Sequence, residues 1–182
     1  PTDEVWTDLE KLVYAPVEHE SGAALYPAAV SIDSSDGNTN EAVYTWVRKM
    51  NKRHPSVLTM AIKGASHGDP EIFATPKRRG VDHANPKKES KADRFGLKVY
   101  IVGTGRAKDW LSGRMKLSGN GPGRHHMYKS VRSDYFEQVT GEIKAPHRTV
   151  KNKLVWQQKS GSAIEAKDCE VYCLHAAWAK RA

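Results

Sequence analysis

Two continuous apolar runs constrain the fold of this chain more than any other feature. The run at 97–105 reads LKVYIVGTG, and the run at 57–64 reads VLTMAIKG. Strands that are apolar on both sides are typical of a parallel sheet, because crossover helices bury both of its faces. Segments with helical periodicity stand beside these runs. The alternation of strand and helix therefore predicts an α/β fold with a mostly parallel sheet.

The other elements are predicted from the same two periodicities. They are a helix that ends before Pro16, a strand at 25–33, a helix at 41–52, a helix at 107–117, a helix at 133–142 capped by Ser133, a strand at 149–159 and a closing helix at 163–180. The segment 142–160 is interpreted as a hairpin insertion. The length of 182 residues favours a single domain over 1–182.

The segment AVSIDSSDGNTNEAV at 29–43 places Asp33 at the end of an apolar strand. An ionised carboxylate at such a position is costly unless something compensates its charge. A metal ion could do so, and so could a helix N-terminus, because Asn38 and Glu41 have the spacing of a capping box. In either case Asp33 would lie at the carboxyl end of a strand, where α/β enzymes commonly keep their chemistry.

A second aspartate, Asp168, borders the apolar stripe of the closing helix, which includes Val171 and Leu174. The helix dipole stabilises an ionised carboxylate near the start of a helix. Asp33 and Asp168 could therefore share one hard cation, Mg²⁺ or Mn²⁺, which prefers oxygen ligands. The alternative is that Asp33 only caps a helix and that Asp168 is merely exposed.

Three further residues are weaker candidates for the same site. Asp36 lies in the loop after Asp33, although turn formation explains it equally well. Glu165 could assist a metal or only favour the helix N-terminus. His126 follows His125 in GPGRHHMY and could contact a phosphate or transfer a proton. A flexible surface loop is the alternative explanation for both histidines.

The charge of the chain, formally +8, favours a polyanionic partner such as nucleic acid. The segment KRRGVDHANPKKESKADR at 77–94 concentrates it, and we interpret 67–96 as a basic polar insertion. Such a stretch could bind phosphates or could be only a solvated loop. The residues expected to contact phosphate are Lys63, Lys77, Arg78, Arg79, Arg106, Lys108, Arg124 and Lys129.

Several functional classes are disfavoured by the sequence. No run approaches the roughly 18 apolar residues that span a membrane. Cys169 and Cys173 stand four apart in a helical segment, which predicts reduced core thiols in an intracellular protein. The chain begins at Pro1 with an acidic segment, which indicates a piece cut from a longer polypeptide.

Six segments in series resemble the nuclease domain of the large terminase subunit of tailed phages, of the lambda-like type. They are SIDSSDGNTNEAVYTWVR, MAIKG, KVYIVGTGRAKDWLSGRM, GPGRHHMY, SDYFEQVTGE and IEAKDCEVYCLHAA, and they cover most of 28–178. The resemblance implies a ribonuclease H-like, integrase-like fold, in which a mixed sheet is flanked by helices. It also implies acidic residues that hold two divalent cations and cleave DNA. By position, Asp33 matches the acid at the end of the central strand, and Asp168 matches the acid of the final helix.

The resemblance further implies features beyond these residues. The family's first catalytic aspartate lies on an opening strand, and no aspartate before Asp33 stands in an apolar strand. We therefore expect this fragment to be truncated at its N-terminus and to lack part of its active site. ATP would serve only a separate motor domain, since the phosphate-binding motif GxxxxGK[ST] is absent here. Double-stranded DNA, the small terminase subunit and the portal are the implied partners, and the host cytoplasm is the implied location. A basic α/β module that binds DNA or a capsid protein without catalysis is the alternative.

Overall fold

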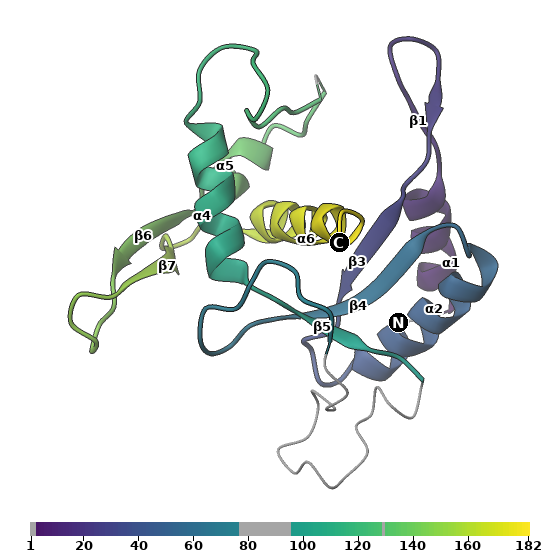
Figure 1. Cartoon of the computed structure of the whole chain (residues 1–182), viewed down its shortest axis with the longest axis horizontal. Coiled ribbons are helices and arrows are strands. Elements are labelled where there is room, and N and C mark those ends of the chain that lie inside the picture. The colour runs from purple at the N-terminus through teal and green to yellow at the C-terminus, as the bar shows by residue number, and fades with distance from the viewer. Residues whose placement is uncertain (1–2, 77–95, 129) are drawn as a thin grey trace, which may run out of the picture.

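A three-stranded parallel sheet forms the centre of the computed structural model, which describes residues 3–76, 96–128 and 130–182. Its strands are β3 (Ala29–Asp33), β4 (Leu58–Gly64) and β5 (Val99–Val102), in the order β3-β4-β5 (Figure 1). Both pairings are parallel, with Ala29 opposite Leu58 and Ala61 opposite Val99. The prediction of an α/β fold with a parallel sheet is confirmed.

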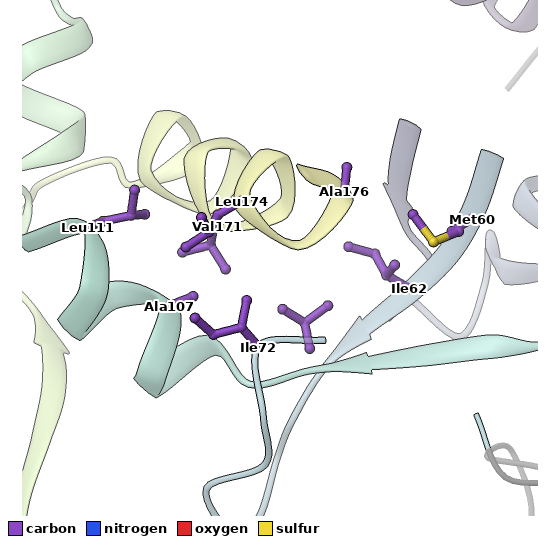
Figure 2. Packing of buried hydrophobic residues seen from close by; sticks show 9 residues of the cluster. Met60, Ile62, Ile72, Ala107, Leu111, Val171, Leu174 and Ala176 are labelled. Atoms are coloured by element: carbon purple, nitrogen blue, oxygen red, sulfur yellow. The ribbon is translucent and has the colours of Figure 1, made fainter. Parts of the chain in front are cut away.

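Helices cover both faces of this sheet. Successive residues of β4 point to opposite sides, so they contact different helices. Met60 and Ile62 face α4 (Thr104–Met115) and α6 (Glu165–Ala179), whereas Ala61 faces α2 (Asn40–Arg53). The helix α1 (Asp3–Tyr14) packs beside α2 through Trp6. Figure 2 shows the cluster of buried side chains on the side of the sheet that α4 and α6 cover. Its members are Met60, Ile62, Ile72, Val102, Ala107, Leu111, Val171, Leu174 and Ala176. Burial of each large apolar side chain contributes about 1.5–3 kcal/mol to stability.

Antiparallel pairing occurs, within the described residues, only in two separate ribbons, which differs from the expected mixed sheet. The first joins β1 (Val17–Glu18) to β2 (Ala24–Leu25), so the strand predicted at 25–33 begins only at Ala29. Tyr26, Pro27 and Ala28 separate the two elements, and a proline cannot donate to a strand ladder.

The second ribbon is the hairpin of β6 (Glu142–Pro146) and β7 (Leu154–Gln158), which follows the short helix α5 (Tyr135–Val139). In this hairpin Glu142 lies opposite Gln158. β7 is shorter than the strand predicted at 149–159, because 147–153 forms a turn in which Asn152 has a φ of 60°. Asparagine tolerates this left-handed conformation better than most residues.

Two helix caps predicted from the sequence are wrong. The N-cap of α2 is Thr39, and no side chain caps this helix. The Asp36 carboxylate instead accepts hydrogen bonds from the Asn38 amide and the Thr39 hydroxyl, both at 3.0 Å. The N-cap of α5 is Asp134 in place of Ser133, also without a side-chain cap. Local turn bonds compete with capping boxes of the right spacing.

The prediction that the two cysteines are core residues is also wrong. Cys169 and Cys173 are free and exposed on α6. They line an apolar groove of about 540 Å³ between α6 and β3. Although both residues are exposed, their sulfur atoms are partly desolvated, and this raises the pKa of both thiols above the ordinary value. None of the helices in the described ranges is long and apolar enough to cross a bilayer.

Candidate active site

Asp33 ends β3 on the side of the sheet that α6 covers. Ser31, two residues earlier on the same face, bonds through its hydroxyl to Nδ1 of His175 on α6 at 2.9 Å. One carboxylate oxygen of Asp33 accepts hydrogen bonds from the Ser35 amide at 2.9 Å and the Ser35 hydroxyl at 2.6 Å. The other oxygen accepts a long bond of 3.4 Å from the Tyr172 hydroxyl. These bonds, and not the N-terminus of α2, compensate the charge.

Tyr172 connects Asp33 to Asp168. Asp168 lies one helical turn before Tyr172 on α6, so both side chains share a face of the helix. Burial of the Tyr172 hydroxyl, followed by the negative charges of Asp33 and Asp168, raises the pKa of this phenol. The hydroxyl therefore remains protonated as a donor near neutral pH. Asp33 therefore contacts the Tyr172 hydroxyl directly, whereas Asp168 acts on it through its charge alone.

The floor beneath this hydroxyl is formed where β4 and β5 end. Gly64 is the last residue of β4, and Thr104 begins α4 directly after β5. A Cβ atom placed on Gly64 would lie 3.3 Å from Cγ2 of Thr104 and 3.9 Å from the Tyr172 hydroxyl oxygen. Glycine thus lets the strand end approach the helix closely. The site accordingly lies at the carboxyl edge of the parallel sheet.

A buried network of ion pairs holds Asp168 from the other side. The Lys108 ammonium lies 2.8 Å from the Glu142 carboxylate and 3.3 Å from Oδ1 of Asp168. The Lys167 ammonium is 3.4 Å from the same Glu142 carboxylate. The side chains of Lys108, Glu142 and Lys167 are only 11%, 6% and 6% exposed. Burial lowers the pKa of Lys167, while Glu142 opposes this shift. Two cations and two anions balance, so the network can remain ionised.

The weaker candidates have other contacts. Asp36 stabilises the turn before α2, and Glu165 accepts a hydrogen bond from the Ile164 amide at 3.1 Å. His126 is exposed and makes no hydrogen bond to the described residues. His125 contacts the Glu170 carboxylate at 3.0 Å, and Tyr135 donates to that same carboxylate. None of these contacts joins the pair of Asp33 and Asp168.

The four cations predicted to contact phosphate that lie within the described residues are engaged with protein groups. Arg106 pairs with Asp69 at 3.1 Å and with Glu71. Arg124 donates to the Gly119 carbonyl and to Asn120. Lys108 is buried in the network above, and Lys63 lies in β4 with interactions of its own. Lys77, Arg78, Arg79 and Lys129 lie outside the described residues, as does most of 67–96.

A polar cleft of about 640 Å³ opens between α4, the loop after β4 and the β6–β7 hairpin. Lys108 lines one part of it, and His147 and Lys153 of the hairpin line another. The hairpin is attached to α4 through Asp109, whose carboxylate accepts bonds from Lys144 at 2.7 Å and from the Trp156 indole at 3.0 Å. The cleft therefore extends from the carboxylate network along the hairpin.

The donor set suits one hard cation. Asp33 and Asp168 offer carboxylate oxygens, and magnesium commonly takes one or two carboxylates together with waters and substrate phosphate. No group of three His, Cys, Asp or Glu side chains arranged for a metal occurs in the described part of the chain. The side chains present thus fit a partly hydrated ion, and they do not by themselves supply a closed cage.

The fold is a parallel α/β sheet with Asp33 at its carboxyl edge, which is where enzymes of this fold class commonly keep their active sites. The comparison with protein families makes the assignment specific. The family described as terminase large subunit gpA, endonuclease domain, matches residues 1–182. The chain belongs to this family, and the resemblance noted in the sequence is confirmed. Membership implies an endonuclease that cuts DNA during packaging. No curated protein and no solved structure matches the chain.

Proposed function

We propose that this domain is a Mg²⁺- or Mn²⁺-dependent endodeoxyribonuclease with a ribonuclease H-like fold, which cuts concatemeric viral DNA for packaging. Asp33 and Asp168 are the proposed metal ligands and catalytic residues. The observation that supports the proposal is the contact of Asp33 with the Tyr172 hydroxyl at the carboxyl edge of the sheet, with Asp168 one turn earlier on the same helix. The small terminase subunit and the portal are the proposed protein partners, and the host cytoplasm is the proposed location.

The residues of the chain divide the work among themselves. When bound, the cation would supply charge neutralisation at the scissile phosphate and activation of a water for in-line attack. Ser35 and Tyr172 orient the Asp33 carboxylate, and Lys108 orients the Asp168 carboxylate. The form with two cations, implied by the resemblance, requires at least one oxygen ligand beyond this pair. The number of bound ions is therefore part of the test.

The test combines a titration with a cleavage assay. Manganese is titrated by calorimetry into the wild-type chain, Asp33→Asn, Asp168→Asn and the control Asp8→Asn, which changes an exposed acid on α1. Plasmid cleavage follows in the same buffer. Both site variants should weaken manganese binding and reduce cleavage by about 100-fold or more, since even residues that only orient ligands matter by 10- to 100-fold. The control should match the wild type. Tight binding that neither site variant alters would refute the assignment of the two aspartates.

The alternative function is a basic module that binds DNA or a capsid protein without catalysis. The absence of a three-ligand metal group among the described residues favours it. The same titration separates the two functions, because a binding module has no need of a divalent ion. Wild-type protein that binds DNA in EDTA but neither binds manganese nor cuts would support the module.

A further inference from the structure

Three cations at the end of the β6–β7 hairpin have no ion-pair partner among the residues that the structure describes. We call residues 147–153 the hairpin tip. Its charged side chains, Arg148, Lys151 and Lys153, are exposed and make no hydrogen bond or ion pair with the described residues. Lys144, nearer the base of the same hairpin, is neutralised by Asp109. Positive charge is thus left available at the tip, whereas an acid neutralises it nearer the base.

The hairpin tip is an ordered element. The His147 amide donates to the Lys153 carbonyl at 2.7 Å and closes the turn. Nδ1 of His147 accepts hydrogen bonds from the amides of Thr149 and Val150, both at 3.2 Å. Asn152 adopts the left-handed conformation that this turn requires. The three cations are therefore presented by a defined backbone.

The base of the hairpin is fixed to the carboxylate site. Glu142, the first residue of β6, contacts Lys108, which in turn contacts Asp168. The five residues of β6 rise by about 3.3 Å each, so the hairpin tip lies roughly 15 Å from Glu142. The polar cleft joins the two regions.

We propose that the hairpin tip binds the DNA backbone at the end of the polar cleft that lies away from the carboxylate network. This inference rests on the proposed function for the role of that network. The partner is duplex DNA, because the family is that of a DNA endonuclease and the three cations complement phosphate charge. The two lysines and one arginine have no neighbouring group that could read bases. They therefore bind the DNA backbone, and the contact is independent of DNA sequence.

The test compares two triple variants that remove the same charge. The tip variant is Arg148→Ala, Lys151→Ala and Lys153→Ala. The control variant replaces Arg48, Lys49 and Lys52, which are exposed on α2, with alanine. Figure 1 shows α2 and the hairpin at opposite sides of the molecule. Circular dichroism verifies that both variants keep the wild-type fold.

Fluorescence anisotropy measures binding to a duplex of about 40 base pairs in EDTA, over salt from about 50 to 200 mM. The tip variant should lose about tenfold or more in affinity, and the slope of log affinity against log salt should flatten by about 2 to 3, since each phosphate contact contributes about 0.9. The affinity of the control variant for the duplex should change by less than about twofold, because we expect the charges on α2 to make no contact with the DNA backbone.

Equal losses in the two triple variants would overturn the proposal, as would a wild-type chain with no measurable affinity for the duplex. Plasmid cleavage by the same proteins in manganese separates this inference from the proposed function. A wild-type chain that does not cut, combined with a binding loss confined to the tip variant, would refute the nuclease and support the DNA contact.

Discussion

His175 makes the stability of this domain sensitive to mild acid. Its side chain is completely buried, and it packs against the rings of Phe73 and Tyr100. Nδ1 contacts the Ser31 hydroxyl at 2.9 Å, whereas Nε2 has no partner among the described residues. Burial alone lowers the pKa of this imidazole from 6.5 to about 4. The folded protein therefore holds the ring neutral.

The magnitude follows from the difference in pKa between the folded and unfolded chains. The unfolded chain binds a proton at His175 once the pH falls below 6.5, while the folded chain resists protonation until about pH 4. The contribution of His175 to the free energy of unfolding is therefore fully present above pH 6.5 and is lost as the pH falls towards 4. One pKa unit corresponds to about 1.4 kcal/mol, so the full loss is about 3 kcal/mol, of which about 2 kcal/mol falls between pH 7 and pH 5.

The assay is urea unfolding at pH 7 and pH 5, followed by the fluorescence of the five tryptophans. The comparison includes wild type, His175→Gln and the control His19→Gln, which alters an exposed turn. From pH 7 to pH 5, the free energy of unfolding of wild type and control should each fall by about 2 kcal/mol more than that of His175→Gln. The slope of this free energy against urea concentration should not change. An equal loss in wild type and His175→Gln would refute the reasoning.

Two further substitutions test the packing that positions the site. Gly103→Ala should cost about 3 kcal/mol or more, because its Cβ atom would lie 2.1 Å from a carbonyl oxygen of the preceding loop. Gly113→Ala, at an open position of α4, should instead stabilise the protein by about 0.5–1 kcal/mol, and thermal unfolding measures both glycine variants. Glu142→Gln should cost about 3–5 kcal/mol in urea unfolding, because it removes the ion-pair partner of the buried Lys167 ammonium and leaves Lys108 paired only with Asp168. The exposed Glu137→Gln should stay within about 0.5 kcal/mol of wild type, and equal effects of the two would contradict this role of the network.

The elements of the central sheet were predictable because their signals are local. The runs that became β4 and β5 are apolar on both sides, and the helix predicted at 41–52 is observed as Asn40–Arg53. Asp33 was identifiable because a carboxylate at the end of an apolar strand needs an explanation. The start of β3 was misplaced although Pro27 marks the interruption of the ladder.

The neighbours of the two aspartates were not predictable from local pattern. Lys108 looked like a surface cation, yet it lies between Ala107 and Leu111, which are buried, and its partner Glu142 comes from the hairpin. Only the packing of α4 against the hairpin brings these charges together. Tyr172 was missed for a related reason, since an aromatic residue on a core helix gives no sign that its hydroxyl will meet Asp33.

The position of β3 at the border of the sheet has a practical consequence for handling the protein. Among the described residues β3 pairs only with β4, so its outer backbone groups can template pairing with another chain. Cys169 and Cys173 line the adjoining groove. Two copies meeting at this border would bring thiols close together, and oxidation would then convert a weak association into a covalent one. Preparations of this domain should therefore be kept in reductant and at low protein concentration.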